Sequence, residues 1–233
     1  MPKAAPKLPT KSRITSLKLQ IAVRNNKPIA ARASPVVAVA DRRYDVVAMG
    51  ASAGGLTALM EVLAPIPQRF PSSILIVQHL HPQHKSLLAP LLANKTALHV
   101  KQAEHGELLL PGVAYVAPPD EHLLVGPGKV QLVHSQLVHF SRPSIDLLFE
   151  SVAGTYGSRC IGVVLTGSGK DGSAGIRAIK EAGGTTIVQD PGHSEFRIMP
   201  DAAVATGCVD LVLPVVEIGE ALTRFCTRNK RHA

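Results

Sequence analysis

A serine in a turn of small residues is the first feature of the sequence that could do chemistry. Ser52 lies in the run Gly50-Ala-Ser-Ala-Gly54, which has the G-x-S-x-G spacing and follows a short apolar segment. A serine on a sharp strand-to-helix turn leaves no room for large neighbours, so Gly and Ala are expected beside it. Free backbone N–H groups at a helix N-terminus could also hold a developing oxyanion. The pattern is compatible with a nucleophile, with a helix-capping serine, or with glycines that cradle a phosphate.

A histidine and an aspartate occupy similar places further along the chain. His79 follows the apolar segment 73–77, and Asp171 lies in a glycine-rich turn after the segment 160–165. A serine hydroxyl is a weak nucleophile until an imidazole takes its proton, and a carboxylate then fixes the imidazole tautomer. Parallel strands, about 5 Å apart, bring their carboxyl ends to one edge of a sheet. Ser52, His79 and Asp171 therefore predict an acyl-transfer triad, in an order that differs from the Ser, Asp, His of α/β-hydrolases.

Each of these residues also has a simpler interpretation. Asp171 lies where an N-cap of the next helix is expected, and His79 could be an ordinary residue at a strand end. His81 or His84 could serve as the base in place of His79. The spacing His79-x-His81-x-x-His84 could also form a metal cluster, since imidazoles are common zinc ligands. Acidic and cysteine partners are missing nearby in the sequence, so no metal site is predicted.

The elements that must position these residues indicate a doubly wound α/β fold. Nearly continuous apolar runs predict buried parallel strands at 44–49, 73–77, 160–165, 185–189 and 211–213. Apolar periodicity predicts helices at about 53–63, 87–93, 144–156, 173–182, 201–206 and 216–225, with Ser144 as the cap of the third. Shorter alternating pieces at 107–116, 122–125 and 130–133 predict hairpins at a sheet edge. The expected fold class is a mostly parallel, doubly wound sheet flanked by helices, with a β-hairpin edge.

The basic charge of the chain is confined to its first part. The 233 residues carry a formal net charge of +8. Residues 1–45 contain ten Lys or Arg and two Asp, which leaves 15 basic and 15 acidic residues in the rest. A basic leader of this kind is typically disordered, and the neutral remainder gives no reason to expect nucleic-acid binding. We expect a leader at 1–43, a catalytic domain at 44–226 and a basic tail at 227–233.

The compartment is indicated by the cysteines and by the length of the apolar runs. Cys160, Cys208 and Cys226 are scattered without C-x-x-C pairing, as small buried residues of a reducing compartment would be. No apolar run approaches the roughly 20 residues of a membrane span. We therefore expect a cytoplasmic protein without membrane insertion.

Five motifs occur in an order that is more specific than any one of them. They are Gly50-Ala-Ser-Ala-Gly-Gly55, Val77-Gln-His79, Pro111-Gly-Val-Ala-Tyr-Val-Ala-Pro118, Arg142-Pro-Ser-Ile-Asp146 and Leu165-Thr-Gly-x-Gly-x-Asp171-Gly-x-x-Gly175. Together, over about residues 44–226, they resemble the catalytic domain of the chemotaxis-receptor methylesterases (CheB). The resemblance implies a doubly wound parallel sheet and hydrolysis of glutamate methyl esters on chemoreceptor helices, with deamidation of glutamine in many members. It implies no cofactor and no metal.

The resemblance also assigns roles to individual residues. The family's catalytic serine, histidine and aspartate correspond to Ser52, His79 and Asp171, and backbone N–H groups near Ala53 and Ser168 are expected to hold the oxyanion. Ser168 stands where the family pattern has methionine, and Ala53 where threonine is common. A backbone donor tolerates both exchanges, whereas a pocket shaped by methionine would differ in rate or substrate choice.

The resemblance extends to partners and control. Arg142 lies beside the crevice by its motif position and could dock an acidic receptor helix, with a surface ion pair as the alternative. Family members commonly carry an N-terminal receiver domain of more than a hundred residues, and 1–43 is too short for one. We therefore expect no phosphorylation switch within this chain, and a separate receiver protein is a candidate for control. Methylated chemoreceptor helices are the expected partners.

A hypothesis of a different class stays open at this point. A non-catalytic regulatory or binding module could keep the same fold and use Gly50–Gly55 and Gly167–Gly172 to bind an anionic ligand or a partner protein. The basic leader would then be its docking arm. Labelling of Ser52 by a fluorophosphonate probe would separate the two hypotheses, because a bare helix cap should not react.

Overall fold

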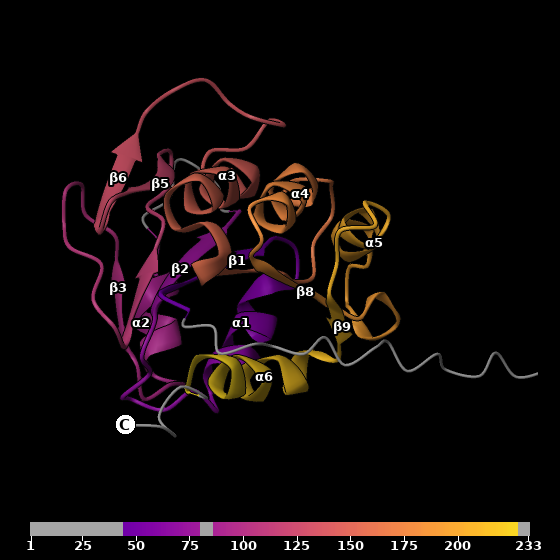
Figure 1. The fold of residues 1–233 in the computed structure, drawn as a ribbon, viewed down its shortest axis with the longest axis horizontal. Coiled ribbons are helices and arrows are strands. Elements are labelled where there is room, and N and C mark those ends of the chain that lie inside the picture. Colours follow the sequence, from indigo (N-terminus) through magenta and orange to yellow (C-terminus); the bar gives the residue numbers. More distant parts are fainter. Residues whose placement is uncertain (1–43, 80–85, 228–233) are drawn as a thin grey trace, which may run out of the picture. The chain divides into compact units, whose positions relative to one another are not determined.

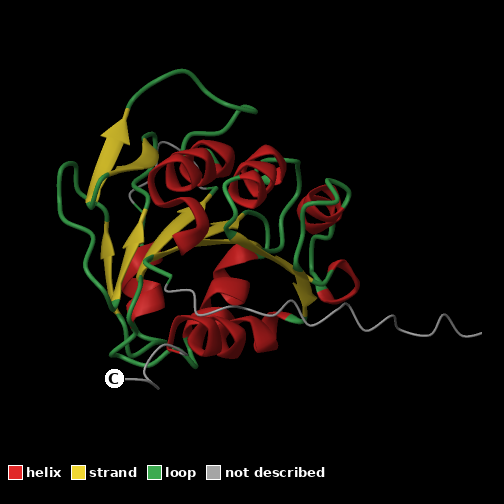
Figure 2. Cartoon of the chain, in the orientation of Figure 1, coloured by secondary structure: helices red, strands yellow, loops and turns green. Residues whose placement is uncertain are grey.

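A seven-stranded parallel sheet forms the centre of the structure. The computed structural model describes residues 44–79 and 86–227, and these contain a sheet of strand order β3-β4-β2-β1-β7-β8-β9 (Figures 1 and 2). All six neighbouring pairs are parallel. The strands are β1 (Val46–Ala51), β2 (Ser73–Gln78), β3 (His99–Gln102), β4 (Val113–Val116), β7 (Cys160–Val164), β8 (Thr185–Gln189) and β9 (Leu211–Leu213). The central strand β1 is therefore flanked by β2 and β7.

Helices cover both faces of this sheet (Figure 1). One face carries α3 (Ile145–Tyr156), α4 (Ser173–Glu181) and α5 (Ile198–Val204), and the other carries α1 (Gly55–Leu63), α2 (Leu88–Ala93) and α6 (Val215–Thr227). Alternate residues of β1 enter two separate hydrophobic clusters: Val46 and Ala48 lie in the cluster with α3 and α4, and Val47 and Met49 in the cluster with α1 and α6. Burial on both faces explains why the strands read as continuous apolar runs.

The predicted doubly wound fold is confirmed, and the middle of the chain needs one correction. The hairpin is confirmed for β5 (His122–Gly126) and β6 (Lys129–Val133), which form an antiparallel sheet of their own. The hairpin expected at 107–116 is wrong, because this segment contributes β4, which pairs in parallel with β2 and β3. Strand β3 was not predicted, since only Val100 of its four residues is buried and an edge strand of this kind lacks an apolar run.

Two smaller elements complete the fold. The 3₁₀ turns η1 (Gly157–Arg159) and η2 (Pro191–His193) precede β7 and α5 respectively. The helix predicted at 201–206 begins earlier, at Ile198. Within the described residues, no helix combines the length and apolar character that crossing a membrane requires.

The register of the three central strands aligns their carboxyl ends. Ala51 pairs with Gln78, and Gly50 pairs with Val164. The pairing continues past the strands, because the N–H of His79 donates to the carbonyl of Ala51 at 3.1 Å. The segments that follow β1, β2 and β7 therefore meet at one edge of the sheet, as the Ser52, His79 and Asp171 hypothesis requires.

Candidate active site

Ser52 lies in a tight turn between β1 and α1. Its N–H donates to the carbonyl of Thr166 at 3.0 Å, and its own carbonyl accepts the N–H of Gly55 at 2.9 Å. Gly54, the N-cap of α1, has a φ of 72°, a left-handed conformation that favours glycine. No side chain caps α1, so the helix-capping interpretation of Ser52 is not what the structure shows. The turn instead holds the serine half-buried at the start of the helix.

The structure brings together the three side chains that the sequence singled out. Oγ of Ser52 lies 3.2 Å from Nδ1 of His79, and Nε2 of His79 lies 2.9 Å from Oδ2 of Asp171. The His79 side chain is 19% exposed, whereas Asp171 is 3% exposed. A substrate can therefore approach the serine and the imidazole while the carboxylate stays shielded from water.

Asp171 is held by more donors than His79 alone. Its Oδ2 also accepts the N–H of Ile145 at 2.7 Å, and its Oδ1 accepts the N–H of Asp146 at 2.9 Å and the hydroxyl of Ser144 at 3.0 Å. Burial by itself would raise the pKa of Asp171, but the hydrogen bonds from His79 and from the two backbone N–H groups outweigh it and hold the pKa below its usual range. The group is thus an anion at neutral pH, able to accept a hydrogen bond from the imidazole N–H.

These contacts revise the simpler interpretation of Asp171 as the cap of its own helix. The N-cap of α4 is Gly172, and no side chain caps that helix from the N-cap position. The Asp171 carboxylate caps α3 instead, since Ile145 and Asp146 are the first two residues of that helix. Ser144 is the N-cap of α3, as predicted, and its hydroxyl accepts the N–H of Leu147 at 3.5 Å.

Gln78 ties the serine turn to the histidine. Its Nε2 donates to the carbonyl of Ser52 at 2.7 Å and to the carbonyl of His79 at 3.1 Å. A β-carbon on Gly55 would lie 1.9 Å from Oε1 of Gln78, so residue 55 must be glycine for this amide to keep its place. Gln78 entered the prediction only as part of the Val77-Gln-His79 motif and was given no role, although a polar residue at the end of a buried apolar strand is a usable signal.

The backbone around Ser52 offers donors for an oxyanion. Ala53 is half-buried and Ser168 is exposed, and the N–H of neither donates a hydrogen bond to any other described residue. The turn containing Gly167 packs against the serine, since a β-carbon on Gly167 would lie 2.8 Å from Cβ of Ser52. The two N–H groups named from the sequence therefore belong to segments that flank the serine.

A second loop braces this turn. The Thr166 hydroxyl donates to the carbonyl of Ala53 at 3.2 Å and accepts the N–H of Phe196 at 2.8 Å. The N–H of Gly167 in turn donates to the carbonyl of Phe196 at 2.9 Å. Residue Met199 approaches the same turn, with its methyl group 2.8 Å from the position of a Gly167 β-carbon. Thr166, Phe196 and Met199 were not singled out from the sequence.

Arg142 is engaged within the chain. Its Nε lies 3.0 Å from Oδ1 of Asp120, its Nη2 binds the same oxygen, and its Nη1 donates to the carbonyl of Ser135. The side chain is only 15% exposed. The ion pair also holds the pKa of Asp120 below its usual value through the Arg142 hydrogen bond. This is the arrangement expected of the ion-pair alternative rather than of a docking residue.

Two alternatives raised by the sequence, a different histidine base and a histidine metal cluster, involve His81 and His84. His81 and His84 lie outside the described residues, so neither the alternative base nor the histidine cluster is tested. Among residues 44–79 and 86–227, no group of three or more His, Cys, Asp or Glu could hold a metal ion.

Cys160 and Cys226 are buried free thiols, and burial raises their pKa to about 12 and about 11.

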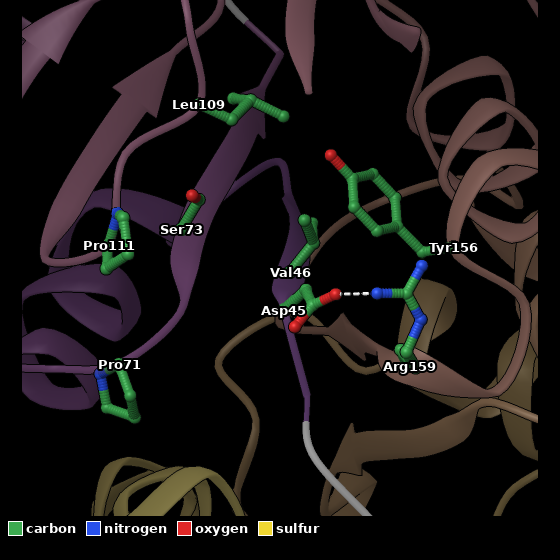
Figure 3. A pocket seen from close by; sticks show the side chains of 8 residues that line it. All are labelled: Asp45, Val46, Pro71, Ser73, Leu109, Pro111, Tyr156 and Arg159. Carbon is green, nitrogen blue, oxygen red and sulfur yellow. Dashed lines mark hydrogen bonds and ion pairs between the residues drawn. The ribbon is translucent and has the colours of Figure 1, made fainter. Parts of the chain in front are cut away.

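A cavity of about 370 Å³ lies at the opposite edge of the sheet (Figure 3). Its lining includes Val46 and Ser73, which begin β1 and β2, together with Tyr156 and the ion pair of Asp45 with Arg159. None of the residues predicted to form the site, such as Ser52, His79 and Asp171, lines this cavity. The cavity is therefore separate from Ser52, His79 and Asp171, which meet at the carboxyl edge.

A serine, a histidine and a buried aspartate at the carboxyl edge of a doubly wound parallel sheet define the class of serine-hydrolase-like α/β proteins. Residues 47–222 match the model of the CheB methylesterase family. The chain belongs to this family, which confirms the resemblance seen in its motifs.

Individual relatives agree with this assignment. The chain is 44% identical over 183 residues to protein-glutamate methylesterase FrzG of Myxococcus xanthus, covering 78% of this chain and 55% of the relative. It is 38% identical over 187 residues to a putative protein-glutamate methylesterase/protein-glutamine glutaminase of Leptospira interrogans, covering 80% of this chain and 97% of the relative. The crystal structure of the Thermotoga maritima CheB methylesterase catalytic domain superposes with a TM-score of 0.74 at 37% identity, covering 78% of this chain and 98% of that one.

The extent of these matches differs between relatives. The chain spans about half the length of FrzG and of an Anaeromyxobacter dehalogenans relative, of which it covers 55% and 53%. It covers almost the whole of the Leptospira protein and of the Thermotoga catalytic domain. The similarity therefore covers part of the longer relatives and nearly all of the shorter ones.

Proposed function

We propose that the chain is a protein-glutamate methylesterase that hydrolyses glutamate methyl esters on chemoreceptor helices. The observation that carries the proposal is the continuous contact from Ser52 Oγ through the imidazole of His79 to the carboxylate of Asp171, at 3.2 and 2.9 Å. Family membership and the printed function of relatives such as FrzG support the ester class and the protein substrate.

The first half of the reaction forms an acyl-enzyme. Ser52 Oγ attacks the ester carbonyl carbon while Nδ1 of His79 takes the hydroxyl proton, and the carbonyl oxygen becomes an oxyanion. The N–H groups of Ala53 and Ser168 donate to that oxygen. The imidazolium is stabilised by the Asp171 carboxylate, which accepts a hydrogen bond from its Nε2–H. His79 then gives the Nδ1 proton to the methoxy oxygen, methanol leaves, and a glutamyl ester of Ser52 remains.

The second half returns the enzyme to its starting state. Water attacks the acyl carbon as His79 takes one of its protons, and the bond to Ser52 Oγ breaks as that oxygen regains a proton. The products are a glutamate side chain and, from the first half, one methanol. Each step uses side chains, backbone N–H groups and water.

The same acyl-enzyme is reached from a glutamine side chain. His79 would then protonate the leaving amide nitrogen, and ammonia would depart in place of methanol. We propose this deamidation as a second activity because relatives carry the double name protein-glutamate methylesterase/protein-glutamine glutaminase. Mass spectrometry of a receptor fragment, with and without the chain, tests it through conversion of glutamine to glutamate.

The setting of the reaction is part of the proposal. We infer a cytoplasmic site of action, because Cys160, Cys208 and Cys226 are free thiols in the structure, as expected in a reducing compartment. A separate receiver protein is proposed as a controlling partner. Arg142 is left out of the substrate contacts, since Asp120 and Ser135 already occupy its guanidinium.

Release of methanol from methylated receptor membranes tests the central activity. Ser52→Ala should abolish release, because no other hydroxyl within the described residues contacts His79. Ser158→Ala is the matched control, since Ser158 is exposed beside the amino end of β7. Undiminished release by Ser52→Ala would refute the assignment, and equal loss in both variants would trace the effect to something other than the nucleophile.

A further inference from the structure

Two buried aspartates, Asp146 and Asp171, connect helices α3 and α4 by capping the two helix N-termini reciprocally, an arrangement called the crossed caps below. The carboxylate of Asp171, which precedes α4, accepts N–H groups from the first turn of α3. The carboxylate of Asp146, the second residue of α3, accepts the N–H of Gly172 at 2.8 Å and the N–H of Gly175 at 2.7 Å in the first turn of α4. The N-terminus of α3 is thus capped by Asp171, from the turn before α4, and the N-terminus of α4 is capped by Asp146 of α3. Charge-assisted bonds to N–H groups are among the stronger kinds.

We propose that Asp146 is a positioning residue of the candidate active site, which fixes Asp171 from two sides and through it orients His79. The inference rests on the proposed function for its catalytic consequence. Asp146 touches neither Ser52 nor His79 in the described contacts, so it acts only through Asp171.

Asp146 fixes both the backbone and the side chain of Asp171, and the first of these effects follows from the covalent geometry of the chain. The N–H of Gly172 lies in the same rigid peptide plane as the carbonyl carbon of Asp171. By accepting that N–H, the Asp146 carboxylate fixes the backbone on which the Asp171 side chain stands. The N–H of Asp146 meanwhile donates to Oδ1 of Asp171 at 2.9 Å and fixes the side chain itself. Ser144 and Ile145 hold only the side chain of Asp171.

Close packing leaves the junction little freedom to move. A β-carbon on Gly175 would lie 2.5 Å from Cβ of Phe149, and one on Gly172 would lie 3.1 Å from Cγ2 of Ile145. Gly172 and Gly175 therefore pack directly against side chains of α3, with no room for a side chain of their own. Without the Asp146 carboxylate, two N–H groups of α4 would lose their acceptor at this junction, so the turn that carries Asp171 would have to shift.

The remaining group that faces Asp146 lies on the loop before α3. Nε2 of His139 is 3.4 Å from Oδ2 of Asp146, and the His139 side chain is 60% exposed. Oδ1 carries the two backbone bonds, so Oδ2 and His139 are not needed for the hold on Asp171. An asparagine at 146 keeps a carbonyl oxygen for the backbone bonds and is therefore the conservative replacement, whereas alanine removes the acceptor.

Steady-state kinetics of the full chain test the proposal. Asp146→Ala should lower kcat roughly 10- to 100-fold with little change in KM, because misplacement of a catalytic group acts on the chemical step. Asp146→Asn should keep most of kcat. Asp210→Ala is the matched control: Oδ2 of Asp210 accepts the N–H of Thr186 at 3.0 Å, at the start of β8 and away from the site, so its loss should lower stability and leave kcat unchanged.

Two results of these kinetic measurements would overturn the proposal. One is a folded Asp146→Ala variant with the kcat of the unmodified chain, and the other is an equal loss of kcat in Asp146→Ala and Asp146→Asn. Should Asp146→Ala fail to fold, amide hydrogen exchange in the unmodified chain decides: slow exchange at Gly172 and Gly175 supports the crossed caps, and exchange as fast as in an open loop overturns them.

A spectroscopic readout separates this proposal from the methylesterase assignment. The proton on Nε2 of His79, hydrogen-bonded to Asp171, should give a low-field NMR signal that Asp146→Ala weakens or removes and Asp210→Ala preserves. Loss of this signal supports the positioning role even in a chain that releases no methanol. An unchanged signal in Asp146→Ala contradicts it even where the esterase assay succeeds.

Discussion

Nδ1 of His79 faces Oγ of Ser52, and Nε2 of the same ring faces Asp171. In the chymotrypsin triad the two nitrogens have the opposite roles, with Nε2 toward the serine. A nitrogen can take the serine proton only through a free lone pair. The neutral ring of His79 must therefore carry its proton on Nε2, where the N–H donates a hydrogen bond to the Asp171 carboxylate.

Nitrogen-15 NMR of the imidazole tests this tautomer. The neutral ring should show a protonated Nε2 and an unprotonated Nδ1, because the anionic Asp171 stabilises a proton on Nε2. Ser52→Ala should change mainly the Nδ1 signal. A neutral ring protonated on Nδ1 would mean that the ring cannot act as the base for Ser52 in this geometry.

Asp171→Asn should reduce turnover by roughly 10³- to 10⁴-fold. An amide at this position loses the negative charge that stabilises the imidazolium, and it presents an N–H group to some of the four donors that now surround the carboxylate. The measurement is kcat for methyl-ester hydrolysis, with Asp210→Asn as a control carboxylate outside the site. Turnover within about threefold of the unmodified chain would remove Asp171 from the machinery.

The two buried aspartates should give opposite dependences of stability on pH. Burial raises the pKa of Asp146 to about 6 from 3.8, with the charge of Asp171 adding to the shift against the N–H groups of Gly175 and Gly172. Between these values the folded chain binds more protons than the unfolded chain, so this group lowers the free energy of unfolding as pH rises from about 4 to about 6. Asp171, with its lowered pKa, contributes stability that is lost as pH falls below about 4.

Urea unfolding of Asp146→Asn at several pH values checks the first of these effects. The stability of the variant relative to the unmodified chain should rise by up to roughly 3 kcal/mol between about pH 4 and pH 7. The stability of Asp171→Asn relative to the unmodified chain should instead rise as pH falls below about 4, because only the unmodified chain loses the contribution of this carboxylate there. A pH-independent difference for Asp146→Asn would show that Asp146 does not titrate in this window.

Gly55→Ala should displace the Gln78 amide, which holds the turn that carries Ser52. The new methyl group would meet Oε1 of Gln78 at 1.9 Å and Cβ of Ala51 at 2.7 Å, so the amide that holds the carbonyls of Ser52 and His79 must move. We expect a loss of about 1–3 kcal/mol in stability together with a lower kcat.

Gly154→Ala is the matched control for that substitution. Gly154 lies in α3, and a β-carbon there meets nothing within 4 Å. Alanine should stabilise the helix by roughly 0.5–1 kcal/mol and leave kcat unchanged. If Gly55→Ala behaved like Gly154→Ala, the hold of Gln78 on the serine turn would not matter for the reaction.

The parallel sheet and the side chains of Ser52, His79 and Asp171 could be predicted because short local stretches of sequence indicate them. Apolar runs such as 73–77 and 185–189 mark buried strands, and Ser52, His79 and Asp171 each follow such a run. Strand β3 was missed because three of its four residues are not buried. Strand β4 was misassigned because its neighbours Pro111 and Gly112 suggested a hairpin turn.

The supporting residues could not be predicted because their partners are distant in sequence. Asp146 and Asp171 are separated by 25 positions, and nothing in either local sequence indicates that each caps the other's helix. The bond between the Thr166 hydroxyl and the carbonyl of Ala53 spans 113 positions. The ion-pair partner of Arg142 could not be predicted for the same reason. Its place in the 142–146 motif suggested that it docks a partner, whereas Asp120, which it binds in the structure, lies outside that motif.

Labelling by a fluorophosphonate probe tests the account most directly, because it asks only whether the Ser52 hydroxyl is an activated nucleophile. Peptide mapping of the labelled chain should place the phosphonyl group on Ser52, with labelling slowed strongly by Asp171→Asn and unaffected by Ser158→Ala. A folded chain that takes up no label, or takes it up on another residue, would contradict the account.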